Sequence, residues 1–563
     1  MKFFSYLKRI PLTPEERKLK KQHIIMVSVS AVLLALSFPP VPLPYLMFFA
    51  LVPYFFVLEK RNGLGEINRI TYLFGFIFSL LTIYWVGAWS ADADPYLMIA
   101  GIALLFFNPT LFLIPSTLYY MARKVFNARI ALLSFPLFWV TYEYVYGITD
   151  IRFPWLILGH GLAYFKSYIQ IADIIGAYGL TILVLSANIF IYLTYKTYRE
   201  EKQINKATLI FSIALIVIPL VYGIIKIKNF VVSDETLNIG LVQPNFNPWN
   251  KWDAGNVNQQ LDQYLELSQK CIDEGAGIVA WPETALPVYL MAGANPREVG
   301  RIRKFVNENS IPLLTGMPDA TFYYNEDEIP GDAKRTKNSG TAYTSYNSIL
   351  LFNPFDHNVQ KYGKVKLVGF GERVPFMDLF PFLQDLLQWS VGISNWNAGK
   401  EIVVFEIPAN SINTSEEGNK IEMDTVQIGG LVCIESVFSD FTAEFVQKGA
   451  NLIAVVTNDS WWGDTSGPYQ HKEINVIRAV ENRRSVFQAA NGGVSCLIDP
   501  LGNTILQSEM LVQTYMVGEA PLEKELTFFT RYPKIVFTIS YVASLIVLAL
   551  FIGRKIKLKR QKV

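Results

Sequence analysis

The stretch GGLVCIESVFSD, residues 429–440, places Cys433 at the end of an apolar run and Glu435 two positions later. A cysteine in this position is either a buried structural thiol or a nucleophile that forms a covalent intermediate. The thiolate is the reactive form, and the amino end of a helix stabilises it. Because the residues that follow predict a helix from about residue 437, Cys433 is a candidate nucleophile.

A cysteine nucleophile also needs a group that accepts its proton. The chain has only four histidines, and His23 and His160 lie in strongly apolar segments, so none is an obvious base. A carboxylate combined with a lysine is the alternative. Glu283 in AWPETALP could accept the thiol proton, and Lys364 in YGKVKLVGFGERVPF could stabilise a developing oxyanion.

Short strands alternate with helices after residue 235, which predicts a layered α/β fold. The expected helices cover about 256–274, 296–309, 437–449 and 468–490. Ligand and catalytic groups in open α/β sheets collect at the carboxyl ends of strands, so polar residues in those positions should converge. These residues are Gln243, Asn245, Glu283, Cys433, Glu435, Asn458 and Asp459.

The apolar residues, 51% of the 563, are concentrated before residue 229 and between 535 and 553. A membrane span needs about 20 apolar residues, and this length predicts about eight spans. The candidate spans are 24–38, 43–58, 70–90, 96–122, 130–147, 168–195, 207–226 and 535–553. We therefore expect three parts: membrane helices over 1–228, a soluble catalytic domain over 229–528, and a C-terminal span with a basic tail over 529–563.

Basic residues beside the spans predict the orientation of the chain. Lysine and arginine gather in the N-terminal segment, in the C-terminal tail and in the alternate loops EKRNG, ARKVFNAR and YKTYREEKQINK, whereas WSADADPY is acidic. Both termini are then cytoplasmic, and the domain between the last two spans lies outside. In a bacterium with two membranes this predicts a multi-pass inner-membrane protein whose catalytic domain faces the periplasm.

Composition excludes several other classes of protein. The net charge of +2 makes nucleic acid a poor partner. Three cysteines are too few for a disulfide framework and match no zinc pattern, so we expect no metal. The covalent chemistry expected of Cys433 uses no organic cofactor either. Cys271 and Cys496 are predicted to be small buried side chains.

Three short motifs, WPE around Glu283, YGK ending at Lys364 and CIES beginning at Cys433, occur in this order and 81 and 69 residues apart. They resemble the glutamate, lysine and cysteine motifs of the nitrilase superfamily, whose fold is a four-layer α-β-β-α sandwich. The segment KVKLVGFGERVP and the eight-span frame resemble the apolipoprotein N-acyltransferase branch of that superfamily. Lys366 is a competing lysine, but only Lys364 follows the Tyr-x pair typical of the motif.

The resemblance implies a two-step acyl transfer. Cys433 would attack the sn-1 ester of a phospholipid and form a thioester, and the acyl chain would then pass to the α-amine of the diacylglyceryl-cysteine that begins an apolipoprotein. Glu283 would act as general base and then acid, Lys364 would stabilise the oxyanion, and Glu372 would orient both. The implied partners are a phospholipid donor, an apolipoprotein acceptor and the membrane.

Other positions are implied to support the site. Trp252, Phe370 and Trp461 align with aromatic residues near the lipid site of the family, although ordinary packing would also explain them, and Glu435 matches a glutamate two residues after the nucleophile. Two positions depart from the family pattern. Ile434 stands where tyrosine is frequent and Gly369 where proline is frequent, which puts substrate contacts beside Cys433 in doubt.

Two further segments carry expectations. The stretch 374–396 is dense in Phe, Leu and Trp, and it is either a buried helix or, for a lipid substrate, an apolar arm that enters the outer leaflet and serves as a lid. Arg478, Glu481 and Arg484 fall at helical spacing and are expected to form structural ion pairs.

Two other functions fit part of the pattern. A membrane-tethered amidase would use the same three residues with water as the second acceptor, but a water-soluble amide would not require eight spans. A scaffold that has lost its chemistry is disfavoured because Glu283, Lys364 and Cys433 are all present.

Overall fold

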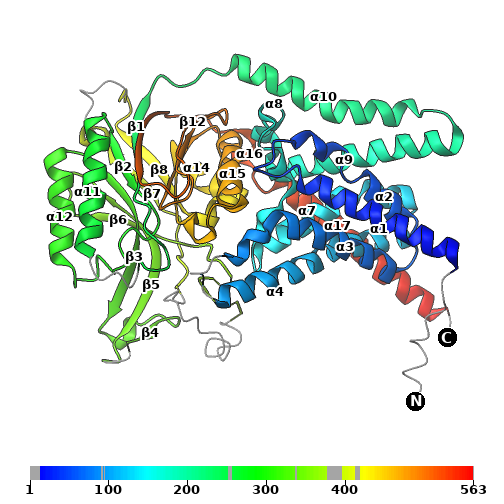
Figure 1. Cartoon of the computed structure of the whole chain (residues 1–563), viewed down its shortest axis with the longest axis horizontal. Helices are drawn as coiled ribbons and strands as arrows, with labels where there is room; N and C mark the ends of the chain where they lie inside the picture. Colours follow the sequence, from blue (N-terminus) through cyan, green and yellow to red (C-terminus); the bar gives the residue numbers. More distant parts are fainter. Residues whose placement is uncertain are drawn as a thin grey trace.

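The computed structural model describes residues 13–89, 93, 95–251, 257–336, 339–369, 371–373, 375–376, 396–412 and 419–561. Helices from the first 229 residues gather on one side together with the last helix, and two β-sheets with their covering helices form the other side (Figure 1). The chain therefore has a helical part and a mixed α/β part, as the sequence predicts.

Apolar side chains dominate the helical part. Its elements are α1 (Pro14–Ala35), α2 (Val52–Glu59), α3 (Leu64–Ile83), α4 (Pro95–Leu111), α5 (Leu113–Val125), α6 (Ala128–Leu133), α7 (Phe135–Ile148), α8 (Lys166–Ile169), α9 (Ala172–Glu201), α10 (Lys206–Asn229), α16 (Phe528–Arg531) and α17 (Ile535–Arg560). Thr13 and Glu16 cap the start of α1 reciprocally, which fixes where that helix begins.

Five helical stretches of the described chain are long and apolar enough to cross a membrane: Leu64–Gly87, Leu97–Val125, Ala172–Glu201, Lys206–Asn229 and Ile535–Arg560. Their outward faces carry large apolar residues such as Ile218, which is 65% exposed. A hydrocarbon environment accounts for that exposure, because water would disfavour it. The expected total of eight spans stays a prediction.

The strands form two sheets. One sheet has the order β13-β1-β2-β3-β5-β4 with β6 also paired to β5, and the other has the order β12-β11-β10-β9-β8-β7. The first sheet is built from β1 (Thr236–Gln243), β2 (Ile278–Trp281), β3 (Leu313–Tyr323), β4 (Lys334–Arg335), β5 (Ala342–Phe352), β6 (Val359–Gly363) and β13 (Thr514–Pro521). The second is built from β7 (Val404–Pro408), β8 (Thr425–Val432), β9 (Leu452–Thr457), β10 (Ser485–Ala490), β11 (Cys496–Ile498) and β12 (Thr504–Gln507).

The two sheets face each other between two helical layers. Ile239 and Ile349 of the first sheet share one buried cluster with Ile428 and Val455 of the second. Helices α11 (Val257–Asp273) and α12 (Pro296–Asn309) cover the outer face of the first sheet, whereas α14 (Ser439–Gln447) and α15 (Ser466–Asn482) cover the second (Figure 1). This is the expected α-β-β-α sandwich, in which the layer of α14 and α15 lies toward the membrane helices.

The helix expected over 468–490 is wrong at its carboxyl end. Helix α15 ends at Asn482, where Arg483 adopts a left-handed conformation with φ +48°, and Ser485–Ala490 forms the strand β10. Strand β10 pairs with β9 and β11, and all six of its residues are buried. Tertiary pairing of this apolar segment therefore overrides the helical periodicity that continues from α15.

Two of the three charged residues expected to form ion pairs do so. Within α15, Arg478 Nε lies 2.8 Å from Glu481 Oε2, and both side chains are fully buried. Arg484 instead donates to backbone carbonyl oxygens, among them that of Ala450 at 2.8 Å. Cys271 and Cys496 are buried, as expected.

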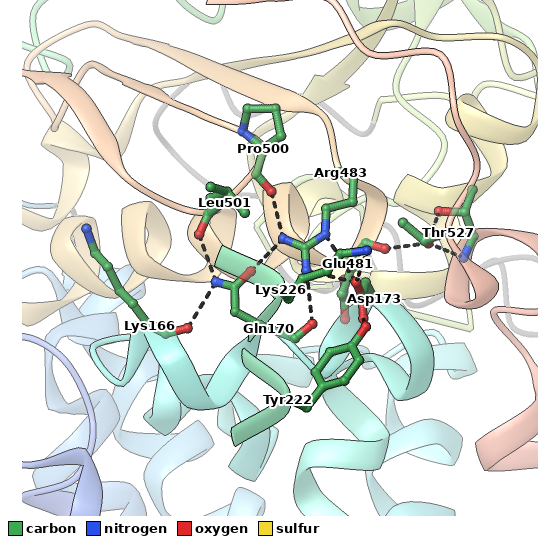
Figure 2. A network of polar contacts seen from close by, with 11 residues as sticks. Lys166, Gln170, Asp173, Tyr222, Lys226, Glu481, Arg483, Pro500, Leu501 and Thr527 are labelled. Carbon is green, nitrogen blue, oxygen red and sulfur yellow. Dashed lines mark hydrogen bonds and ion pairs between the residues drawn. The ribbon is translucent and has the colours of Figure 1, made fainter. Parts of the chain in front are cut away.

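The end of α15 and Arg483, which follows it, join the sandwich to the membrane helices (Figure 2). Arg483 Nη2 donates to Asp173 Oδ2 at 2.8 Å and to the Gln170 carbonyl oxygen at 3.1 Å. Glu481 Oε1 accepts a bond from the backbone N–H of Ala177 in α9. These buried polar contacts hold the sandwich and the helical part together.

Candidate active site

A cavity of about 150 Å³ lies at the carboxyl ends of strands from both sheets, where the sequence places its polar residues. Leu97 of the membrane helix α4 also contributes to its wall, so the cavity borders both parts of the molecule. The lining residues are Leu97, Glu283, Thr284, Asn347, Lys364, Val368, Gly371, Glu372, Trp396, Cys433, Asn458, Trp461 and Trp462.

The three candidate catalytic residues come together in this cavity. Glu283 follows β2, Lys364 follows β6 directly, and Cys433 follows β8 directly. The ammonium group of Lys364 is almost fully buried, and its Nζ lies 3.8 Å from Glu283 Oε1 and 2.7 Å from Glu372 Oε2. Of the two carboxylates, Glu372 is therefore the direct partner of the lysine.

Asn347 organises the two carboxylates and was not identified from the sequence. Its Nδ2 donates to Glu283 Oε1 at 2.6 Å and to Glu372 Oε1 at 2.9 Å, while its backbone carbonyl accepts the N–H of Lys364 at 2.8 Å. The residue lies in the middle of β5, where no strand end or motif marks it. Only the pairing of β5 with β6 brings it beside Lys364.

Cys433 has a strained backbone and a partly exposed side chain that lines the cavity. Its φ of +50° is in the left-handed region, which costs a residue other than glycine free energy and is frequent at functional sites. Burial, together with the nearby Glu283 carboxylate, raises the pKa of the Cys433 thiol well above its usual value. The resting nucleophile is consequently a neutral thiol that requires a base.

The helix expected from about residue 437 is confirmed, with its first residue two positions later. Cys433–Val437 forms a 3₁₀ turn, and the α-helix begins only at Ser439. The amino end of α14 is thus six residues after the nucleophile. A helix dipole falls off within about one turn, so it does not account for thiolate formation at Cys433.

The charges around the thiol suit proton transfer. Burial is the main cause that raises the pKa of Glu283, and the nearby Glu372 carboxylate adds to it, whereas the Lys364 ammonium opposes it. The two carboxylates raise the pKa of Lys364 against the effect of its burial. A carboxylate with a raised pKa beside a permanently charged lysine is a base matched to a weakly acidic thiol.

Glu435 connects the turn that begins at the nucleophile, Cys433–Val437, to the segment after Lys364 through hydrogen bonds. Its side chain is fully buried, and its Oε1 accepts bonds from Tyr362 Oη at 2.8 Å, Val365 N at 2.7 Å and Lys366 N at 2.9 Å. Its Oε2 accepts the N–H of Val432 at 2.9 Å. The carboxylate therefore fixes the separation of Lys364 and Cys433 without lining the cavity.

Replacing Glu435 by Gln is expected to destabilise the protein by about 1–3 kcal/mol. The amide NH₂ of Gln is a donor and would face the N–H of Val432 or one of the other donors, which would leave a buried N–H without an acceptor. The thermal unfolding midpoint of the purified protein measures this effect. Glu422→Gln, at a solvent-exposed glutamate, is the control and should unfold at the temperature of the unaltered chain. Equal midpoints for both variants would contradict the role given to Glu435.

The remaining expected site residues divide into three groups. Trp461 lines the cavity, with its ring 4.7 Å from that of Trp249. Lys366 lies over the rings of Phe438 and Phe441, outside the cavity lining. Outside the described residues lie Trp252, Phe370 and most of the expected arm, namely 374 and 377–395.

The two departures from the family pattern have clear places in the fold. Ile434 is buried within the 3₁₀ turn. A Cβ atom at Gly369 would lie only 2.8 Å from the carbonyl oxygen of Asp150, so the loop that follows α7 approaches this glycine closely. A larger residue at position 369 would require one of the two segments to move.

No group of three or more His, Cys, Asp or Glu side chains within the described ranges could hold a metal ion. The polar groups that line the cavity are instead suited to acyl transfer through a thiol: a nucleophile, a base and a fixed cation.

Two family models match the chain. A model described as the apolipoprotein N-acyltransferase N-terminal domain matches residues 30–190, and a model described as carbon-nitrogen hydrolase matches residues 238–523. Together they cover most of the helical part and the whole of the sandwich.

The chain is also similar to curated relatives over nearly its full length. It is 31% identical over 514 residues to an apolipoprotein N-acyltransferase of Chlorobaculum tepidum, with 90% of this chain and 92% of the relative covered. A relative with the same description from Geobacter metallireducens is 28% identical over 552 residues, with 96% and 98% covered. One from Rickettsia typhi is 27% identical over 477 residues, with 83% and 86% covered.

Proposed function

The chain belongs to the apolipoprotein N-acyltransferase family, and from this premise we propose that it is an acyltransferase that N-acylates lipoproteins at the membrane. We further propose Cys433 as nucleophile, Glu283 as general base and Lys364 as oxyanion stabiliser. The observation that carries this proposal is their convergence in one cavity that also includes a membrane-helix residue, Leu97.

In the first step the donor would be a phospholipid. Glu283 accepts the thiol proton as Cys433 Sγ attacks the carbonyl carbon of the sn-1 ester. The Lys364 ammonium stabilises the negative charge on the carbonyl oxygen. The carbon–oxygen bond then breaks, and the leaving alkoxide takes the proton from Glu283 to give a lysophospholipid and an acyl thioester on Cys433.

In the second step the acceptor would be the N-terminal diacylglyceryl-cysteine of an apolipoprotein. Its α-amine attacks the thioester carbonyl and gives a proton to Glu283, and Lys364 again faces the oxyanion. The carbon–sulfur bond breaks, an amide forms, and Glu283 returns the proton to the Cys433 thiolate. One base and one cation thus serve both steps, and the oxidation state of every atom is unchanged.

Glu372 and Glu435 would support this chemistry by fixing Lys364 and the nucleophile turn, and the tryptophan at 461 would contact the lipid. The side chains at 252 and 370 are proposed for lipid contact on the family resemblance alone. We also propose the division into residues 1–228, 229–528 and 529–563, with the sandwich on the periplasmic side of an inner membrane. Acyl chains in the outer leaflet would then lie beside the wall to which Leu97 belongs.

The direct test is the intact mass of the purified chain after incubation with dipalmitoyl phosphatidylethanolamine in detergent micelles. The unaltered chain is expected to gain the mass of one palmitoyl group, which hydroxylamine removes. Cys433→Ala should gain nothing, because the other two thiols, Cys271 and Cys496, are buried and do not line the cavity. Addition of a diacylglyceryl-cysteine peptide should discharge the adduct and yield an N-acylated peptide.

The amidase alternative predicts a different result in the same experiment. No adduct would form with phospholipid, and a small amide would be hydrolysed at Cys433. A lipid-derived adduct that discharges only to water, with the peptide present, would likewise contradict the transferase.

A further inference from the structure

The short turn that begins at the nucleophile is supported from below by a buried histidine that the reaction does not use directly. His471 of α15 is fully buried beneath the 3₁₀ turn Cys433–Val437. Its Nε2 lies 3.2 Å from the carbonyl oxygen of Cys433 and 3.0 Å from Ser436 Oγ. On the opposite side, its Nδ1 lies 2.9 Å from Asp459 Oδ2.

The oxygen atoms around the ring determine which hydrogen bonds it can make. The Cys433 carbonyl oxygen acts only as an acceptor, so a hydrogen bond at this contact is donated by an N–H on Nε2. Ser436 Oγ, the second neighbour of Nε2, can accept or donate, and Nδ1 lies beside the Asp459 carboxylate, which orients the ring.

The bond to Cys433 acts on one particular peptide group. The carbonyl of Cys433 and the N–H of Ile434 belong to the same plane and point in opposite directions. Ile434 is the second residue of the turn, and the first N–H groups of such a turn have no partner within it. A backbone N–H directly after a nucleophile is a recurrent donor to the oxyanion of acyl transfer.

We propose that His471, held by Asp459, is a positioning residue that fixes the peptide between Cys433 and Ile434, so that the Ile434 N–H faces the oxyanion together with Lys364. This inference rests on the proposed acyl transfer. It also gives the left-handed conformation of Cys433 a cause, because the hydrogen bond from the His471 ring compensates the strain at that residue.

Neighbouring residues hold His471 itself in place. Gln470, directly before it, accepts bonds from Trp85 Nε1 at 3.1 Å and Trp155 Nε1 at 2.8 Å, and donates to the carbonyl oxygen of Thr82 at 3.0 Å. All three partners belong to the helical part of the chain. The orientation of the nucleophile peptide is therefore linked through α15 to the membrane helices.

The test compares two reactions of Cys433 in the full chain. Acylation by dipalmitoyl phosphatidylethanolamine passes through an oxyanion, whereas alkylation by iodoacetamide does not. Loss of an oxyanion donor costs about 100- to 1000-fold. His471→Phe keeps the volume of the ring but lacks the N–H on Nε2, so it should slow acylation at least about 30-fold while alkylation stays within about threefold.

Two further variants separate positioning from folding. The amide of His471→Gln reaches the Cys433 carbonyl, so its acylation rate should stay within about tenfold of that of the unaltered chain. The side chain of His471→Asn is shorter, so this variant should acylate as slowly as His471→Phe. This comparison also applies if His471→Phe does not fold. His23→Phe, at the buried histidine of α1, is the matched control and should acylate as the unaltered chain does.

Four outcomes would overturn the inference. Equal acylation rates for the unaltered chain and His471→Phe would remove the role of the ring, and so would equal rates for the Gln and Asn variants. Equal losses of acylation and alkylation in His471→Phe would mean that the substitution lowers the reactivity of the Cys433 thiol itself. The oxyanion donor would then not be affected. An unaltered chain that forms no acyl adduct would overturn the proposed function as well, and this result differs from the other three.

Discussion

Glu283→Gln is expected to slow formation of the acyl adduct at pH 7 by about 100- to 10,000-fold, the usual contribution of a general base. Because burial raises the pKa of Cys433 well above its ordinary value, almost no thiolate forms at this pH without a base. The amide of Gln can keep the bond to Asn347 but cannot accept the proton. The rate of adduct formation, followed by intact mass, measures the effect.

The dependence of this rate on pH distinguishes loss of a base from a general loss of structure. In the unaltered chain the rate should fall as pH decreases through the raised pKa of Glu283, because protonation removes the base. In Glu283→Gln the thiol can lose its proton only to the solvent. The fraction of thiolate, and with it the rate, should therefore rise about tenfold per pH unit well into the alkaline range. A variant as slow at pH 9.5 as at pH 7 would contradict the assignment, and Glu401→Gln, at an exposed glutamate, is the control.

The parts of this architecture that follow from local pattern could be predicted from the sequence. Apolar runs predict the helical part, and alternating strands and helices predict the sandwich, because both depend on hydrophobic periodicity. The positions of Glu283 and Cys433 at strand ends follow from the same reasoning, since the carboxyl ends of strands converge in such sheets. Lys364 was instead identified from its YGK motif, because no strand was expected directly before it.

Other features depend on contacts between distant residues and have no local signal. Asn347 lies within a strand and gains its role only because β5 pairs with β6. His471 is 38 residues from the Cys433 carbonyl that it contacts. No pattern in the sequence links two positions so far apart, so its place beneath the nucleophile could not be predicted. The strand β10 follows a helix whose periodicity it continues, so only sheet pairing reveals where that helix ends.

Lys364→Met should be the most damaging replacement at the site, since the lysine serves both catalysis and stability. Removing an oxyanion donor slows acylation by about 100- to 1000-fold. The change also leaves the buried carboxylates of Glu283 and Glu372 without their cation, which costs about 3–5 kcal/mol when one partner of a buried pair is removed. Acylation rate and thermal unfolding should therefore both change.

The loss of stability should depend on pH, with a sign that follows from the carboxylates. The Lys364 ammonium lowers the pKa of Glu283, so its removal raises that pKa further above the value in the unfolded chain. A carboxyl group whose pKa is raised on folding stabilises the folded state at low pH, and this contribution is lost as pH rises through the folded pKa. Lys364→Met should accordingly be less destabilised at pH 5 than at pH 8.

Lys304→Met is the control, at a lysine of α12 outside the site. Lys304 is exposed and pairs with the exposed Glu308 at 3.7 Å, and pairs of this kind contribute about 0–1 kcal/mol. This variant should acylate at the rate of the unaltered chain and unfold close to its midpoint at both pH values. If Lys364→Met behaved in the same way, the lysine would be neither the oxyanion donor nor the counter-charge of the two carboxylates. If its stability loss were larger at pH 5 than at pH 8, the carboxylates would not take up a proton when the cation is removed.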